Sequence, residues 1–312
     1  MFTLGIDTSN YATSLAVFDT DAEEVVCACK RFLPVKEGQL GLRQSDAVFH
    51  HTQALAPMLE ELNAQFPVRR AQAIGVSVKP RPVEGSYMPC FTVGTGTARA
   101  LALALGVPLC ETTHQQGHIA AALFAAGDSS LFARETLVFH ISGGTTELLR
   151  CRDGQVLEKM GESTDLYAGQ AVDRIGVRLG FAFPAGAQLS QLAAEWPEPV
   201  RAKVSLQGAN CSFSGLENQC GALLDAGKPP AFVAKYCLCA VGRTVLGMIR
   251  AARLRCSDAP VVCAGGVMSS DIIRTQVQQA MPDVHFVPAQ YASDNAIGVA
   301  ILAAKEAGAW PM

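Results

Sequence analysis

Two histidines four residues apart are the side chains of this sequence best suited to chemistry. His114 and His118 are followed by an apolar run over residues 119–126, which predicts a helix. Residues four apart share one helix face, and that spacing allows two imidazoles to bind one metal ion. Two imidazoles do not complete a coordination shell, so a further ligand must come from elsewhere. The alternative interpretation is a pair of histidines that only form hydrogen bonds.

The residues between the histidines argue against proteolysis. In zinc proteases with the pattern H-E-x-x-H, a glutamate directly after the first histidine acts as the general base. This chain has Gln115 at that position. A zinc protease is therefore a poor interpretation of the pair.

Length and composition predict a globular protein of two lobes. The chain has 312 residues, of which 49% are hydrophobic and 17% are charged, so its cores can be well filled. Its net charge of −3 does not indicate nucleic-acid binding through bulk electrostatics. The sequence shows neither a secretion signal nor an unbroken apolar stretch of membrane-spanning length, so we expect a soluble, cytoplasmic chain with no membrane partner. The 11 cysteines are then expected to be reduced core residues.

Two segments share one pattern, in which an apolar strand, a short polar turn and a returning apolar strand follow one another. They are residues 3–19 and residues 137–150. This repetition indicates a duplicated lobe. Because no low-complexity linker is found, we expect a packed hinge between a first lobe over residues 1–108 and a second over residues 109–312. The last helix, at about residues 294–307, is expected to pack back towards the first lobe.

Strands and helices alternate in the remaining sequence, which is typical of the α/β class. Hydrophobic periodicity and the positions of glycine and proline predict strands over residues 73–78, 107–112 and 261–267, and helices over residues 45–66, 96–105, 168–179, 213–224 and 231–253. Ser45 is expected to cap the first of these helices.

Three turns of small residues could contact phosphate oxygens, because backbone N–H groups and hydroxyls are accessible where no bulky side chain intervenes. They are residues 7–9, residues 142–145 and the pair Gly265 and Gly266. Each turn alone is more simply structural, whereas the ordered set of three is more specific. One phosphate turn in each lobe and a late diglycine for the nucleoside resemble the actin, hexokinase and Hsp70 superfold (ASKHA). The fold expected is two such lobes around a nucleotide cleft.

Within that superfold, the motifs are similar to those of the TsaD family, the tRNA adenosine threonylcarbamoyltransferases. The similarity covers nearly the whole chain, and the motifs occur in the family's order. They are residues 114–118, 142–146, 168–173, 211–216, 264–267 and 293–295.

The resemblance implies a divalent metal ion held by two histidines and an aspartate. These map onto His114, His118 and Asp294. Asp294 precedes an apolar helix, so its carboxylate can point outward from the helix start. Imidazole ligands argue against a pure magnesium site and favour iron or zinc.

The resemblance also implies an adenine nucleotide or threonylcarbamoyl-AMP as the ligand, with its phosphate near the 142–144 turn and its adenosine against Gly265 and Gly266. Asp7 and Ser9 are the candidate catalytic residues at the reacting end. The candidate ligand-binding residues are Ser142, Gly143, Gly144, Thr145, Gly169, Asp173, Gly186, Gly265, Gly266 and Ser270.

The sequence departs from the family at several polar positions. The family's opening motif is close to I-E-T-S-C-D-E-T, but Tyr11 and Ala12 stand at its two later acidic positions. Gln116 replaces the glutamate of H-x-E-G-H, and Ser270 replaces an asparagine. We therefore expect a divergent member of the family.

The activity implied is transfer of a threonylcarbamoyl group from threonylcarbamoyl-AMP to an adenosine of tRNA, with the metal polarising the carbonyl. A non-catalytic nucleotide- and metal-binding protein and a carbamoyltransferase with another acceptor stay open. A small-molecule kinase is disfavoured, because kinase chemistry has no place for the histidine pair. The partners implied are tRNA, TsaB-like and TsaE-like proteins, or a second copy of the chain.

Overall fold

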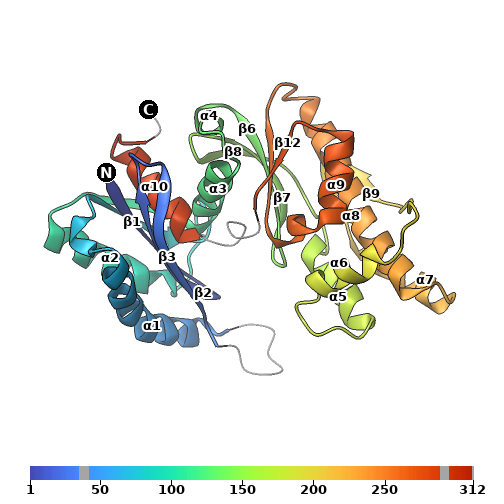
Figure 1. Cartoon of the computed structure of the whole chain (residues 1–312), viewed down its shortest axis with the longest axis horizontal. Coiled ribbons are helices and arrows are strands. Elements are labelled where there is room, and N and C mark those ends of the chain that lie inside the picture. Colours follow the sequence, from blue (N-terminus) through green and yellow to red (C-terminus); the bar gives the residue numbers. More distant parts are fainter. Residues whose placement is uncertain (35–41, 289–294, 311–312) are drawn as a thin grey trace. The chain divides into compact units, whose positions relative to one another are not determined.

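The computed structural model describes residues 1–34, 42–288 and 295–310. The chain divides into two compact units (Figure 1). Unit 1 consists of Met1–Phe132 and Asp294–Met312, and unit 2 is the continuous segment Ala133–Ser293. The boundary predicted at residue 108 therefore differs from this division, since it lies inside unit 1.

Unit 1 is built on a five-stranded mixed sheet with the order β3-β2-β1-β4-β5. The strands β1 to β3 form an antiparallel meander, and β4 and β5 continue the sheet in parallel with β1. The strands are β1 (Phe2–Ser9), β2 (Ala12–Asp19), β3 (Glu24–Phe32), β4 (Ala73–Lys79) and β5 (Leu109–Thr113).

Unit 2 repeats this topology. Its larger sheet has the order β12-β11-β6-β7-β8, in which β6 to β8 are antiparallel while β11 and β12 run parallel to β6. The strands are β6 (Thr136–Ile141), β7 (Thr146–Arg152), β8 (Gln155–Glu162), β11 (Val261–Ala264) and β12 (Val284–Phe286). The duplication predicted from the two hairpins is therefore confirmed.

The alternation of β1 side chains sorts the helices of unit 1 onto two faces of its sheet. Leu4 and Ile6 are buried in the hydrophobic cluster that includes residues of α1 and α2. On the other face, the Thr3 hydroxyl donates to the Ala300 carbonyl of α10 over 2.7 Å. The helices are α1 (Gln44–Gln65), α2 (Phe91–Leu105), α3 (His114–Ala125), α4 (Ser130–Ala133) and α10 (Asn295–Glu306), with the 3₁₀ turn η1 (Val68–Arg70).

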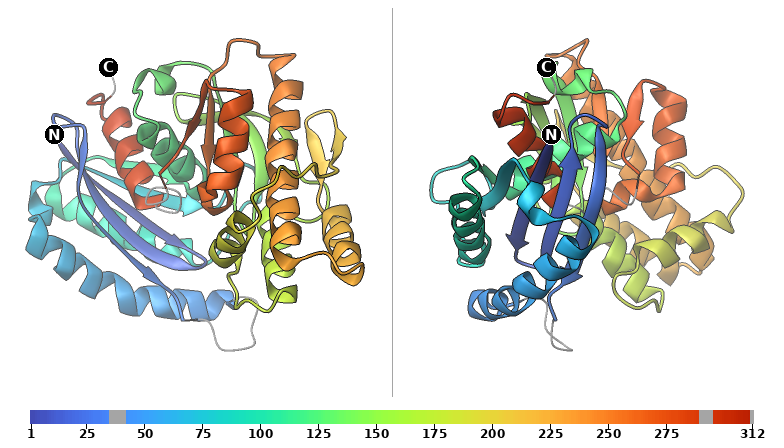
Figure 2. Two further views of the ribbon diagram at one scale, coloured as in Figure 1. Left: turned by 45° about the vertical axis from the view of Figure 1, so that its right-hand side comes forward. Right: turned by 60° about the vertical axis from the view of Figure 1, so that its left-hand side comes forward.

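Glycines allow α10 to lie directly against its neighbours. A Cβ at Gly5 of β1 would be 2.0 Å from the Ala296 carbonyl oxygen, and one at Gly75 of β4 would be 2.5 Å from that of Val299. A Cβ at Gly298 would be 1.8 Å from the Gly117 carbonyl oxygen of α3. Only glycine permits such close backbone contact. As a result α10 lies beside α3 and the sheet (Figure 2).

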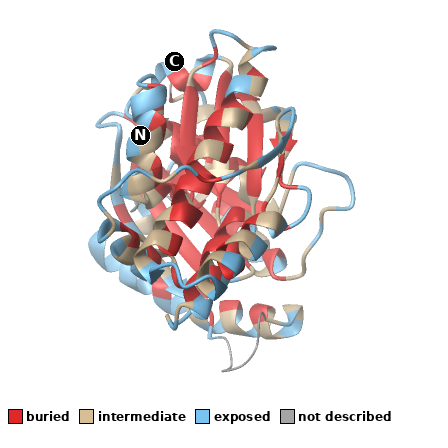
Figure 3. Ribbon diagram, turned by 90° about the vertical axis from the view of Figure 1, so that its right-hand side faces the viewer, coloured by how far each residue is buried: buried red, intermediate tan, exposed pale blue. Residues whose placement is uncertain are grey.

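The core of unit 2 lies between its larger sheet and the long helix α8. On length and composition, α8 is the one described helix that could cross a membrane, but 78% of its apolar window is buried inside the unit (Figure 3). The remaining elements are α5 (Ala168–Arg178), α6 (Gly186–Ala194), β9 (Ser205–Gln207), β10 (Asn210–Ser212), α7 (Ser214–Asp225), α8 (Pro230–Arg253), η2 (Gly266–Ser269) and α9 (Asp271–Ala280).

Several element boundaries differ from the predictions. The strands β3 and β8 and the helix α6 were not predicted, and α2 begins at Phe91 rather than at residue 96. The N-cap of α1 is Arg43, and its side chain makes no capping hydrogen bond. Ser45 therefore lies within the helix, so its prediction as the cap was wrong.

Candidate functional site

A capping box fixes the start of α3, where the histidine pair stands. The Thr113 hydroxyl accepts from the Gln116 backbone N–H, while the Gln116 side-chain oxygen accepts from the Thr113 backbone N–H over 3.1 Å. The hydroxyls of Thr112 and Thr113 donate to the same Gln116 oxygen. These bonds satisfy donors that every helix start leaves without partners. Gln116 thus does the structural work that a glutamate would do here.

His114 and His118 lie side by side on α3, as their spacing predicted. Their ring centroids are 4.7 Å apart and the rings are nearly perpendicular. Gly117 lies between them at the contact with α10, where a larger side chain would meet Val299 and the Asn295 carbonyl. The glycine of the motif therefore serves the packing of two helices.

The carboxylate of Asp7 faces His114 from the end of β1. Its two oxygens lie 3.1 and 3.2 Å from His114 Nδ1. Asp7 is fully buried. Burial on its own would raise the pKa of Asp7, but the charge of His114 and hydrogen bonds from His114, Ser77 and Ser9 outweigh it, so that this pKa lies below its ordinary value. The structure thus favours an ionised Asp7.

The first residue of α10 approaches the same imidazole. The side-chain nitrogen of Asn295 lies 2.9 Å from His114 Nδ1, and Asn295 is buried. Its side-chain oxygen has no hydrogen-bond partner among the described residues. Asp294, the predicted third ligand, lies outside the described residues, although it is adjacent to Asn295 in the sequence.

The residues at this position suit a metal ion in part. In the described part of the chain, no group of three or more His, Cys, Asp or Glu side chains is arranged to hold a metal. The imidazole pair and the unpartnered Asn295 oxygen nevertheless form a donor set that fits iron or zinc better than magnesium. Asp294 would have to complete it.

The turn between β1 and β2 is held by a second buried histidine that the sequence analysis did not select. His51 of α1 contacts the Ser9 carbonyl through Nε2 at 2.9 Å and the Thr13 hydroxyl through Nδ1 at 2.7 Å. Ser9 is itself buried and interacts with Asp7. At the two positions where the family is acidic, Tyr11 is exposed and Ala12 is buried. These two side chains bring no charge to this turn.

In unit 2, the small-residue turn after β6 lies against the start of α5. A Cβ at Gly169 would be 2.5 Å from the Ser142 carbonyl oxygen and 2.6 Å from the Gly143 nitrogen. The space around Gly143 and Gly144 is open, and Ser142 accepts from the Thr145 side of the turn only through its backbone N–H, which donates to the Thr145 carbonyl. An open turn next to a helix N-terminus can bind anionic oxygens.

The diglycine after β11 lies beside that turn. Gly265 has a positive φ of 99°, and a Cβ there would be 2.1 Å from the Ile141 carbonyl oxygen at the end of β6. Gly266 faces open space. Ser270, four residues later, shares a hydrogen bond of 3.0 Å with Ser190 of α6. The structure thus brings the predicted residues at 142–145, 169 and 265–266 together.

Asp173 connects α5 to the start of α6. Its carboxylate accepts from the Ala185 backbone N–H over 2.8 Å. Burial raises the pKa of Asp173, although hydrogen bonds from the Ala185 and Gly186 backbones oppose this effect. Asp173 and Gly186, both predicted to bind the ligand, are therefore neighbours, and one Asp173 oxygen has a structural role.

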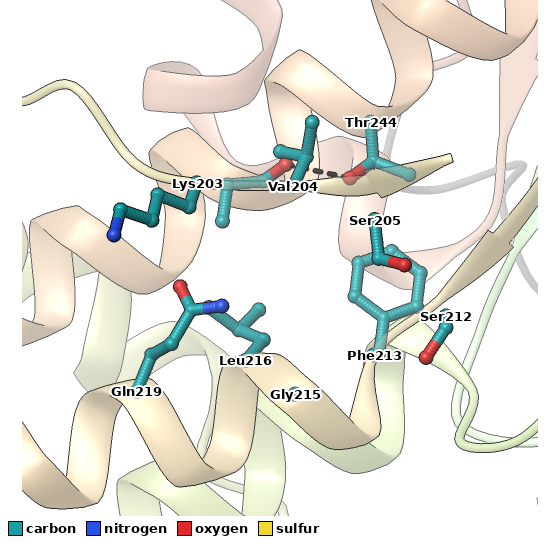
Figure 4. Close-up of a pocket in the computed structure, with 10 residues that line it drawn as sticks. Lys203, Val204, Ser205, Ser212, Phe213, Gly215, Leu216, Gln219 and Thr244 are labelled. Carbon is teal, nitrogen blue, oxygen red and sulfur yellow. Dashed lines mark hydrogen bonds between the residues drawn. The ribbon is translucent and has the colours of Figure 1, made fainter. Parts of the chain in front are cut away.

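The motif at residues 211–216 surrounds a small cavity (Figure 4). The cavity has a volume of about 20 Å³ and is lined by residues that include Ser212, Phe213, Leu216 and Lys203. Drug-sized ligands need several hundred Å³, so this space is far too small for a nucleotide. Nearby, Asp165 accepts hydrogen bonds from the Phe213 backbone and from the hydroxyls of Ser212 and Ser214, which lower its pKa against the opposing effect of burial. The motif therefore has a structural role here.

Comparison with solved structures identifies the fold. The similar structures include HypF in its phosphate- and nucleotide-bound form, with a TM-score of 0.64 and 13% identity over 99% of this chain and 56% of that one. A hexokinase of the ROK family from Thermus thermophilus has a TM-score of 0.52 and 18% identity, with 99% of both chains covered. Component A of the 2-hydroxyglutaryl-CoA dehydratase from Acidaminococcus fermentans has a TM-score of 0.59, 17% identity and 99% coverage of both chains. The predicted hexokinase-like superfold is confirmed.

Comparison with known sequences identifies the family. The chain is 28% identical to the tRNA N6-adenosine threonylcarbamoyltransferase of Carboxydothermus hydrogenoformans, over 95% of this chain and 90% of that one. It is 29% identical to that of Thermus thermophilus, over 97% and 92%. Residues 36–301 match the family described as TsaD, tRNA N6-adenosine threonylcarbamoyltransferase, a range that leaves out Asp7 and Ser9. The chain therefore belongs to the TsaD family of tRNA N6-adenosine threonylcarbamoyltransferases.

Proposed function

We propose that this chain transfers a threonylcarbamoyl group from threonylcarbamoyl-AMP to an adenosine of tRNA, with the help of a divalent metal ion. The observation that supports this most directly is the histidine pair at the start of α3, where a buried carboxylate faces one imidazole. That arrangement occurs within a chain of the threonylcarbamoyltransferase family.

In this proposal, His114, His118 and Asp294 hold the ion. When bound, a divalent ion supplies Lewis-acid polarisation of a carbonyl oxygen. The protein's own contribution is orientation, because α3 is fixed by its capping box and Asp7 restrains the His114 ring.

The adenylate part of the donor is proposed to bind unit 2. The open turn at Gly143 and Gly144, next to the N-terminus of α5, offers backbone N–H groups to the phosphate. Gly266 leaves room for close approach of the nucleoside. Asp173 is then suited to contact the nucleoside with the carboxylate oxygen that does not accept from Ala185.

The transfer reaction tests the proposal directly. Purified, metal-loaded protein is incubated with threonylcarbamoyl-AMP and unmodified tRNA, alone and with TsaB-like and TsaE-like partners, and the nucleosides are analysed by mass spectrometry. We expect threonylcarbamoyladenosine, and we expect His114→Ala to abolish it. Unmodified adenosine under all these conditions would exclude the transferase.

A second candidate is a nucleotide- and metal-binding protein without transfer activity. Tyr11 and Ala12 favour it, because two positions that are acidic in the family's opening motif carry no charge here. This candidate predicts that adenine nucleotide binds while tRNA stays unmodified. Calorimetry with AMP, run beside the transfer assay, separates the two candidates, and a double change of Tyr11→Asp and Ala12→Glu should raise transfer only if the missing charges limit it.

A further inference from the structure

Asp7 makes its closest side-chain contact with a single ring nitrogen. Both carboxylate oxygens lie within 3.2 Å of His114 Nδ1, and no part of Asp7 is exposed to solvent. A buried carboxylate is stable as an anion only when donors surround it. The hydroxyls of Ser9 and Ser77 face it as well, but His114 is the principal partner.

This contact fixes where the imidazole carries its proton. An ionised carboxylate can only accept, so Nδ1 must be the protonated nitrogen. A protonated Nδ1 cannot accept from Asn295, and the Asn295 oxygen, which lacks a partner among the described residues, is the atom that suits this N–H. Both neighbours of Nδ1 are then satisfied by one tautomer. In that tautomer Nε2 carries a lone pair.

Asp7 does not itself complete a metal site with the two histidines. No group of three such side chains in residues 1–34, 42–288 and 295–310 is arranged to hold an ion. Its effect must therefore pass through His114. Asp7 lies at the end of a central strand and His114 at the first position of a capped helix, so both groups are held by rigid elements.

We propose that Asp7 is a positioning residue, which holds His114 in the Nδ1–H tautomer and so presents Nε2 as the metal-binding atom. The inference rests on the metal site of the proposed function, but not on the identity of the acceptor. It changes the role expected for Asp7 from catalysis to support of a ligand.

Nuclear magnetic resonance of the metal-free protein tests the tautomer directly. The chain is labelled with ¹⁵N-histidine, His114 is assigned with His114→Gln, and long-range ¹H–¹⁵N spectra are recorded at about pH 8, where a histidine of ordinary pKa is neutral. We expect Nδ1–H for His114. Observation of Nε2–H would overturn the inference, and this wild-type measurement needs no variant to fold.

Substitutions at Asp7 provide the second readout. Asp7→Asn can turn an N–H toward Nδ1 and so favour the other tautomer. We expect its affinity for Zn²⁺ or Co²⁺, measured by titration, to fall roughly 10- to 100-fold. Asp7→Glu, which restores the family's residue, should regain most of the affinity. Unchanged affinity and tautomer in Asp7→Asn would refute the proposed role.

Asp165→Asn is the matched control. It makes the same chemical change at a hydrogen-bonded carboxylate of unit 2, and it should leave the His114 tautomer and the metal affinity as they are. If tRNA is never modified but the Asp7 predictions hold, the proposed function fails and this inference stands. If tRNA is modified while His114 carries its proton on Nε2, the reverse is true.

Discussion

At the scale of single residues, a neutral histidine in the interior imposes a dependence on pH. His51 has no exposed surface and uses both ring nitrogens, toward Thr13 and Ser9. Burial lowers its pKa from the ordinary 6.5, and the hydrogen bond from the Ser9 backbone opposes this effect only in part. The unfolded chain therefore binds a proton that the folded chain does not, at pH values between the two pKa values.

The free energy of unfolding should accordingly decrease as pH falls below about 6.5, and the contribution of His51 should be fully present above that value. We expect His51→Gln to be less stable than the wild type at pH 7.5 by roughly 1–3 kcal/mol, since two buried polar groups lose their partners. The variant should also show a flatter dependence on pH. Urea denaturation between about pH 5.5 and 8 measures both effects, and parallel pH profiles for the two proteins would contradict the argument.

The metal ion itself is tested at this scale. We expect the purified wild type to contain a divalent metal, and His114→Ala and His118→Ala to lose it, because each removes an imidazole ligand. Elemental analysis of the three proteins provides the measurement. His50→Ala, which changes a histidine on α1, is the control. Equal metal in all four proteins would eliminate the site.

The sequence predicted the histidine pair because its spacing is local, and the helix there forms as expected. The Asp7 contact could not be predicted from the residues alone, since it joins positions 107 apart in the chain. Asn295 was missed for the same reason, although its place beside Asp294 was a usable signal. The glycine residues predicted to form phosphate turns do converge in unit 2, but the binding of a ligand there remains a prediction.

At the scale of elements, contact between backbones decides how α10 is placed. Gly298 and Gly117 meet where α10 crosses α3, and a Cβ at Gly298 would overlap the Gly117 carbonyl. Helices that lack side chains at the crossing cannot be moved apart without opening the core. The three positions predicted to bind metal are thus located by two glycines that carry no chemistry.

We expect Gly298→Ala to destabilise unit 1 by roughly 3 kcal/mol, because the added methyl group forces α10 away from α3. Thermal unfolding measures this change, and metal binding should weaken along with it. Gly96→Ala is a suitable control, since Gly96 lies inside α2 with open space where a Cβ would stand. That variant should be neutral or slightly more stable. Similar stability of both variants would show that the crossing tolerates a side chain.

The two hairpins and most helices could be predicted because their apolar periodicity is strong. The strands β3 and β8 were missed because each is the edge strand of its sheet and is mostly exposed or half-buried, so that it lacks an alternating apolar pattern. The charged and polar residues Glu158, Lys159 and Glu162 of β8 illustrate this. Their hydrogen bonds to β7, which no local pattern reveals, make the segment a strand.

At the scale of the whole molecule, the two units differ in how the chain builds them. Unit 2 is one continuous segment with its own hydrophobic core. Unit 1 needs α10, which comes from beyond unit 2 in the sequence. Trp310 adds to this attachment, because its ring contacts Phe18 and Phe132 of unit 1. The boundary at residue 108 was predicted without knowledge of these distant contacts, which retain α3 in unit 1.

A chain that ends at residue 293 should therefore keep unit 2 and lose unit 1. Without α10, the face of β1 and β4 at Gly5 and Gly75 has no helix to cover it. Hydrogen exchange followed by mass spectrometry should show protected amides in α8 and rapid exchange in β1. Protection of β1 equal to that of the whole chain would mean that α10 is dispensable.

The dependence of unit 1 on α10 also sets the order in which the protein can mature on the ribosome. The 161 residues from 133 to 293 must be translated before α10 emerges, which takes roughly 10 to 30 s at common elongation rates. During that interval, a nascent chain would expose the bare side of its first sheet to chaperones. Acquisition of metal would then be a late event, possible only after translation is nearly complete.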